Sequence, residues 1–174
     1  MDTATAKTLA AYNSFANDRM NAIVGKLDDA GWNREFPGYF KSIKSLCNHL
    51  YISDFVWLKR FSGLRKFAYM SDRLLSEDVA FGMSVLGGPA DYVEKRKTLD
   101  ALLIRFADEI TSQDLESTLV YKDSGGNGHR KNFGALVLHV FNHETHHRGM
   151  ISLYLEQQGI ENDFNSLSEM MEEL

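Results

Sequence analysis

Long apolar repeats at helical spacing, almost free of proline, constrain this chain more than any other feature. The 174 residues include only two prolines, Pro37 and Pro89, and in four segments apolar residues return every three or four positions. Such spacing is typical of helices that bury one face. The segments cover residues 5–30, 42–61, 91–110 and 133–158. The pattern predicts an all-α four-helix bundle, with residues 1–174 forming a single domain.

Two local signals mark the borders of these segments. Asp91 followed by Glu94 resembles a capping box, so we expect the third helix to take Asp91 as its N-cap after Pro89. Residues 115–120 favour a strand, and residues 123–128 (Asp-Ser-Gly-Gly-Asn-Gly) have the composition of a tight turn. A short β-hairpin is therefore expected before the last long helix. Two stretches without clear periodicity are interpreted as a crossover and a tail, residues 65–88 and 160–174.

Composition excludes several classes of partner. The chain has 24 acidic and 19 basic residues, and its basic residues are scattered, so no nucleic-acid partner is expected. No apolar run reaches the ~18 residues of a membrane span, and residues 1–11 lack the order of a signal peptide. The single cysteine, Cys47, excludes an internal disulfide and lies on an apolar stripe, as a core residue does. We expect a cytoplasmic protein with no membrane partner.

Residues 143–147 read His-Glu-Thr-His-His and lie in the fourth segment. His143 and His147 are four residues apart, so on a helix they point to the same side, one turn from each other. Both fall on the apolar line of that segment, whereas His139 lies at its edge and His146 is rotated away. An unsatisfied buried polar group costs about 1–3 kcal/mol. A shared metal ion would satisfy both imidazoles, and buried carboxylates or hydroxyls are the alternative.

A third ligand has two candidates in the second segment. Catalytic sites for metals such as zinc normally take three protein ligands and leave one position open. His49 is the only histidine of that segment, but it lies at the margin of the apolar stripe. Asp54 lies closer to the centre of the stripe, as a ligand or as a hydrogen-bond acceptor beside one. Helical angles alone leave this choice open.

The same five residues match the His-Glu-x-x-His motif of zinc peptidases, in which the glutamate, here Glu144, activates water. The match is short, and the extended metzincin form needs glycine at the position of Met150. The chain also offers no strand-rich peptidase domain. Peptidase chemistry is therefore disfavoured.

Three stretches together resemble a known family. Residues 138–149 (Leu-His-Val-Phe-Asn-His-Glu-Thr-His-His-Arg-Gly) are similar to the signature of the DinB/YfiT-like superfamily of small metal-binding four-helix bundles. Residues 12–17 (Tyr-Asn-Ser-Phe-Ala-Asn) and residues 48–61 also resemble family segments. The resemblance implies an up-down-down-up bundle with one long crossover, a homodimer, and a metal triad of His49, His143 and His147. The family name refers to damage-inducible expression and does not imply DNA binding.

The resemblance also implies a class of chemistry, because relatives include transferases and isomerases that use low-molecular-weight thiols. Three neutral imidazoles do not reduce the positive charge of a divalent ion. The ion therefore lowers the pKa of a bound thiol enough for the thiol to ionise at neutral pH. Zinc or nickel is the expected ion, and iron also suits imidazole ligands. In this interpretation Asp54 or Glu144 assists proton transfer and Arg148 steadies an anionic group of a small-molecule substrate. A surface Arg148 paired with Glu144 is the alternative.

Two other functions stay open at this point. A three-histidine ion also lowers the pKa of bound water to about 7, which would make the protein a metal-dependent hydrolase. The remaining possibility is a non-catalytic, dimeric metal-binding stress protein. Structural zinc sites usually have four protein ligands, so a fourth donor such as His139 or Asp54 would favour that possibility.

Overall fold

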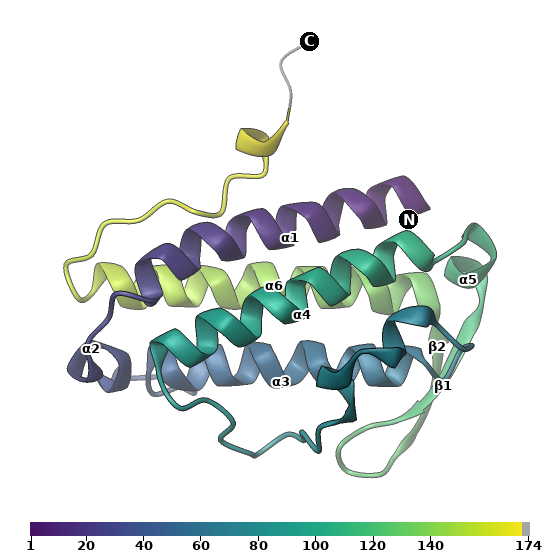
Figure 1. Cartoon of the computed structure of the whole chain (residues 1–174), viewed down its shortest axis with the longest axis horizontal. Helices are drawn as coiled ribbons and strands as arrows, with labels where there is room; N and C mark the ends of the chain where they lie inside the picture. The colour runs from purple at the N-terminus through teal and green to yellow at the C-terminus, as the bar shows by residue number, and fades with distance from the viewer. Residues whose placement is uncertain (172–174) are drawn as a thin grey trace.

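Four long helices lie side by side in the computed structural model, which describes residues 1–171 (Figure 1). They are α1 (Thr3–Val24), α3 (Ile43–Phe61), α4 (Pro89–Glu109) and α6 (Phe133–Glu156). Their apolar faces meet in a continuous core, which is rich in aromatic rings where α3, α4 and α6 approach the hairpin. The predicted all-α four-helix bundle is confirmed.

The long helices run in the predicted up-down-down-up order. In Figure 1, α1 and α6 run in one direction, and α3 and α4 run in the other. Because α3 and α4 are parallel, the chain must return along the bundle between them. Residues 62–88 make this crossover and contain two short 3-10 helices, η1 (Ala68–Ser71) and η2 (Arg73–Ser76).

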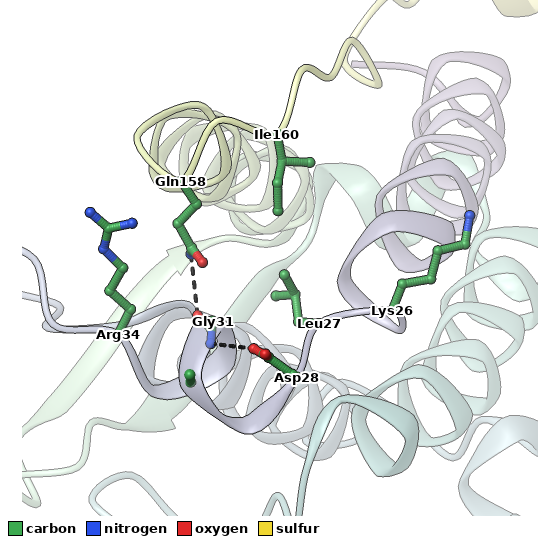
Figure 2. A pocket seen from close by; sticks show the side chains of 8 residues that line it. Lys26, Leu27, Asp28, Gly31, Arg34, Gln158 and Ile160 are labelled. Carbon is green, nitrogen blue, oxygen red and sulfur yellow. Dashed lines mark hydrogen bonds between the residues drawn. The ribbon is translucent and has the colours of Figure 1, made fainter.

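The first predicted helix is too long at its C-terminal end. α1 ends at Val24, and a separate short helix, α2 (Asp29–Asn33), follows it. The side chain of Asp28 accepts a hydrogen bond of 2.7 Å from the Gly31 amide and so caps α2, because aspartate favours the start of a helix over its interior. The side chain of Gln158, just after α6, donates a hydrogen bond of 3.2 Å to the Gly31 carbonyl across an open cleft (Figure 2).

The predicted capping box of the third helix is wrong. α4 begins at Pro89 with Gly88 as its N-cap, so Asp91 lies inside the first turn. Proline is favoured at the first helical position because its missing N–H has no partner there in any case. The Asp91 carboxylate instead accepts a hydrogen bond of 2.8 Å from the Gly87 amide and contacts the ammonium of Lys95 at 3.1 Å.

A hairpin precedes the last helix, as predicted. β1 (Thr118–Lys122) and β2 (Gly128–Asn132) pair antiparallel, and a short helix, α5 (Ser112–Glu116), precedes them. The α5 helix is absent from the prediction. Asn132 ends β2 and caps α6, because its side chain accepts a hydrogen bond of 2.8 Å from the Ala135 amide. The hairpin therefore fixes where the histidine-bearing helix begins.

The predicted tail is anchored along the bundle as far as the structure describes it. Phe164 is buried in the core, and the hydroxyl of Tyr12 donates a hydrogen bond of 2.7 Å to the Asn165 carbonyl. A last 3-10 helix, η3 (Ser168–Met170), follows, and residues 172–174 of the predicted tail lie outside the described residues. Within residues 1–171, no helix has the length and apolar character needed to cross a membrane.

Candidate metal centre

Three histidines from two helices, α3 and α6, converge on one another. His49 comes from α3, and His143 and His147 come from α6. One ring nitrogen of each lies within 4.8 Å of the others, and the Nε2 atoms of His49 and His143 are 2.9 Å apart. His147 is buried, whereas the other two are half-buried. The structure therefore brings together the three residues that the resemblance implied, at the edge of the bundle interior.

The donor set fits a divalent metal ion. The Nδ1 atoms of His143 and His147 are buried and have no hydrogen-bond partner among the described residues. The Nε2 atoms of His49 and His143 do face each other, at 2.9 Å, so these two imidazoles either share a proton or share a cation. Imidazole suits zinc, nickel and iron alike, so the side chains define the type of ligand and not the element.

The environment of the triad keeps its rings neutral. Burial, followed by the charge of neighbouring histidines, lowers the pKa of His143 to about 4 and that of His147 to about 3. Burial also lowers the pKa of His49. Neutral imidazole is the form that binds metals, because protonation removes the lone pair of the ligand nitrogen. At neutral pH the three rings are therefore ready to coordinate without first losing protons.

Aromatic rings surround the triad. The ring of Phe40 lies 4.8 Å from that of His49 and 5.2 Å from that of His147, measured between centroids. The ring of Phe81 lies 6.3 Å from that of His49. These rings favour an apolar portion in any ligand that reaches the site.

The other histidines of α6 do not complete a four-ligand site. The ring centroid of His139 is 6.0 Å from that of His143 and 5.5 Å from that of Trp57. His146 is exposed beside His147. In the part of the chain that the structure describes, no further histidine, cysteine or carboxylate joins the cluster. Three protein donors are therefore available there.

A buried ionic network fills the bundle behind the triad. The guanidinium of Arg96, from α4, lies 2.8 Å from the Asp54 carboxylate, 2.9 Å from that of Asp100 and 3.6 Å from that of Glu144. Arg148 contacts the other oxygen of Glu144 at 3.4 Å. All five side chains are buried, so these charges depend on one another for compensation.

Asparagines from α1 complete this network. Asn13 and Asn17 donate hydrogen bonds of 3.1 and 2.9 Å to the same oxygen of Asp100. Their amide oxygens accept hydrogen bonds from the guanidinium of Arg148. The Nε of Arg148 also donates a hydrogen bond of 3.2 Å to the side-chain oxygen of Asn165 in the tail. Two of the polar residues in the first family-like stretch thus tie α1 to α4 and α6.

Three carboxylates against two guanidiniums leave the network one negative charge in excess. Burial, and next the charge of Glu144, raises the pKa of Asp54 well above its usual value. Burial likewise raises the pKa of Asp100, to about 6. The network therefore retains a proton at pH values where exposed carboxyl groups have lost theirs.

The predicted assisting residues all lie in this network, away from the triad nitrogens. Asp54 is not a member of the histidine cluster, in which the residue from α3 is His49. The alternative that placed Arg148 on the surface is wrong, because its side chain is fully buried, although its pairing with Glu144 is present. A guanidinium inside the bundle is possible because carboxylate and amide oxygens from two helices surround it.

Sequence reasoning missed Arg96 and Asp100. The available signal was the position of Arg96 between Tyr92 and Leu99 on the apolar face of α4, where a charge needs a buried partner. Cys47 is a buried core residue as predicted, and burial raises the pKa of its thiol. It therefore contributes no reactive thiolate.

A bundle with a neutral three-histidine cluster between its second and fourth long helices defines a class of small helical proteins able to hold a metal ion. The model of the DinB family matches residues 1–165, and the chain belongs to this family. Protein DinB of Bacillus subtilis (strain 168) is 24% identical over 156 residues, which are 87% of this chain and 84% of that protein. The crystal structure of the DinB-like protein YjoA from Bacillus subtilis superposes with a TM-score of 0.61 at 14% identity, covering 91% of this chain and 97% of that one. The structural comparison with YjoA shows a shared fold.

Proposed function

We propose that this protein is a metal-dependent enzyme of the thiol S-transferase or isomerase type. His49, His143 and His147 would hold a divalent ion, with zinc or nickel the expected metal and iron a third candidate. The bound ion would supply a positive charge that lowers the pKa of a thiol placed beside it, so that the thiolate acts as a nucleophile at neutral pH. A low-molecular-weight thiol and a small electrophile would be the reactants.

The observation that carries this proposal is a neutral donor set with no fourth protein ligand. Three imidazoles add no negative charge, so the acidifying effect on a thiol is not reduced by the ligands themselves. A structural zinc site usually has four protein ligands, and the described cluster has three. This supports an open coordination position over the non-catalytic alternative.

Asp54, Glu144 and Arg148 stay predicted assisting residues, and their geometry supports a positioning role. Glu144 follows His143 in the chain, and its carboxylate lies between the guanidiniums of Arg96 and Arg148. It thereby links α6 to α4 one residue away from a triad member. We propose that this network holds the face of α6 on which His143 and His147 lie.

Hydrolysis is less well supported by the same geometry. A hydrolase that used Glu144 as its base would need that carboxylate within reach of water at the metal. The side chain is fully buried and engaged by two arginines. A thiol reaction needs no such base, because the thiol already ionises beside the cation.

A direct experiment combines metal loading with a panel of thiols. The protein, purified without chelating resin and loaded in turn with zinc, nickel or iron, would be mixed with an electrophile such as chlorodinitrobenzene and with cysteine, glutathione or cysteinyl-glucosamine thiols. We expect conjugation that depends on both metal and thiol and is lost in His49→Ala. Turnover without any thiol would favour hydrolysis, and no turnover with any metal and thiol would contradict the proposal.

The assembly and location of the protein stay predictions. The resemblance implies a homodimer, which light scattering of the metal-loaded protein at micromolar concentration would detect as twice the 19.8 kDa chain mass. We also propose that the protein works in the cytoplasm on a small molecule, without nucleic-acid or membrane partners. Fractionation of its native cells tests the location.

A further inference from the structure

One arginine on the same helix as His49 is half-buried and has no carboxylate in direct contact. Among residues 1–171, four arginines are buried or half-buried. Three of them contact carboxylates: Arg65 contacts Asp114, Arg96 contacts Asp54, and Arg148 contacts Glu144. The fourth, Arg60, has no carboxylate within 4.0 Å in this part of the chain. A partly desolvated guanidinium with no carboxylate in direct contact is a favourable place for an anionic ligand.

Aromatic rings hold the Arg60 guanidinium in place. Its central carbon lies 4.9 Å from the ring centroid of Trp57, 5.3 Å from that of Tyr121 and 5.9 Å from that of Phe81. Cation–π contacts of this kind orient the guanidinium plane and leave its N–H donors unused. The carboxylate of Asp123, in the hairpin turn, is occupied by hydrogen bonds with His129 and Asn127. The charge of Asp123 acts on Arg60 from a distance, and the guanidinium is preorganised with no carboxylate in direct contact.

Arg60 lines a cleft suited to a small anion with an apolar portion. The cleft has a volume of about 420 Å³ and lies between α3, the crossover and the hairpin turn. Its lining residues are Val56, Lys59, Arg60, Val79, Ala80, Phe81 and Ser124. Two of them are cationic, one is a hydroxyl, and none is acidic. Clefts of this size hold small-molecule ligands, and the few polar groups within them set the orientation of the ligand.

The cleft adjoins the metal-binding cluster. His49, Val56 and Arg60 are spaced by seven and four residues, so they occupy one face of α3. The 11 residues from His49 to Arg60 correspond to about 16 Å along the helix axis, and a helical side chain leans toward the N-terminus, which brings the guanidinium closer to the triad. Phe81 lies beside both, 6.3 Å from the His49 ring and 5.9 Å from the Arg60 guanidinium.

We propose that Arg60 recognises an oxyanion, such as a carboxylate, on the substrate or thiol whose reacting end lies at the histidine triad. The ligand would then be an elongated anion with an apolar middle that lies along α3 past Phe81. This inference rests on the proposed function, because the triad provides the second anchor of the ligand. Arg60 would set specificity and would take no part in bond making.

The test compares two thiols that differ only in charge. Protein loaded with cobalt(II) would be titrated with mercaptooctanoate and with mercaptooctanol, and the near-ultraviolet thiolate-to-cobalt absorption band would report each dissociation constant. We expect the carboxylate to bind about tenfold more tightly than the alcohol to the native chain, since a charge-assisted hydrogen bond is worth roughly a factor of ten or more. In Arg60→Gln the two affinities should agree within twofold, with the mercaptooctanol affinity unchanged.

Arg34→Gln is the matched control. Arg34 is exposed and lines the separate cleft beside α2, so this variant removes the same charge elsewhere on the molecule (Figure 2). It should keep the tenfold preference. Three results would overturn the role of Arg60 and leave the thiol function standing. The native chain could bind both thiols with equal affinity, Arg60→Gln could keep the tenfold preference, or Arg60→Gln could lose affinity for both thiols equally. Absence of the absorption band with either thiol would overturn the proposed thiol function and, with it, this substrate class.

Discussion

The ring of His147 lies close to both other rings of the cluster, 4.3 Å from that of His143 and 4.7 Å from that of His49. We therefore predict that His147→Ala loses most of its bound metal, falling from about one ion per chain toward zero, because two imidazoles alone hold a divalent ion weakly. The exposed neighbour His146 provides the control, and His146→Ala should keep full occupancy. Elemental analysis of protein purified without chelators measures both, and full metal content in His147→Ala contradicts the triad.

Glu144 compensates two buried guanidiniums, and its removal should destabilise the fold more than the metal site. We predict that Glu144→Gln lowers the free energy of unfolding by about 3 kcal/mol, since breaking a buried ion pair leaves Arg148 without a carboxylate. Glu156→Gln, an exposed change on the same helix, should change stability by less than about 0.5 kcal/mol. Urea denaturation of both variants tests this. A Glu144→Gln variant as stable as the native chain would show that the charge of Glu144 does not stabilise the fold.

At the level of single residues, the sequence predicted the histidines better than the charges. His143 and His147 share a side of one helix, so their proximity follows from helical geometry alone. His49 comes from another helix, and only the family resemblance selected it over Asp54. The position of Arg96 depends on carboxylates from α3, α4 and α6 at once. Helical angles describe one helix at a time, so they cannot reveal a partner supplied by its neighbours.

Among the elements, α6 depends most on how it begins. The side-chain oxygen of Asn132 caps the helix by accepting a hydrogen bond from the Ala135 amide. The Nδ2 of the same side chain donates a hydrogen bond of 3.0 Å to the Leu115 carbonyl. We predict that Asn132→Ala lowers the free energy of unfolding by about 1–2 kcal/mol without lowering metal content, since the triad begins three turns further along. Lys131→Ala, an exposed change in the preceding residue, is the control. Loss of metal in Asn132→Ala at full stability would contradict this separation.

The existence of the elements was easier to predict than their ends. Long apolar periodicity located all four long helices, and the glycine-rich turn located the hairpin. The errors lie where two start signals compete, as when Pro89 begins α4 and places Asp91 inside it. The five-residue helices α2 and α5 are too short to show a period, and both depend on a side chain cap, from Asp28 and Thr111 respectively.

For the whole molecule, the bundle and its topology were predicted by different means. The number of long amphipathic segments predicts a four-helix bundle, but only the family resemblance supplied the parallel arrangement of α3 and α4. Periodicity contains no information on direction once a connection is as long as residues 62–88. The Arg60 cleft could not be predicted at all, because its walls come from α3, the crossover and the hairpin turn, which become neighbours only in the folded chain.

Stability of the metal-free molecule should respond to pH through two opposed sets of groups. The pKa values of His143 and His147 fall from 6.5 to about 4 and about 3 on folding, so their contribution is present above pH 6.5 and is lost as the pH falls toward 3. The pKa of Asp100 rises from 3.8 to about 6, so its contribution is present below pH 3.8 and is lost as the pH rises through 6.

Asp100→Asn separates these two contributions, because it removes the carboxyl group and leaves the histidines unchanged. The advantage of the native chain over the variant should be larger at pH 4.5 than at pH 7, by an amount on the order of 1–2 kcal/mol, since Asp100 must give up its proton inside the bundle as the pH rises. Urea unfolding of both chains at the two pH values, in the presence of a chelator, measures this difference. Asp108→Asn, on the exposed end of the same helix, should show no such change with pH. A difference independent of pH would mean that Asp100 ionises in the folded protein as readily as in the unfolded one, and the network would then hold its proton on another carboxylate.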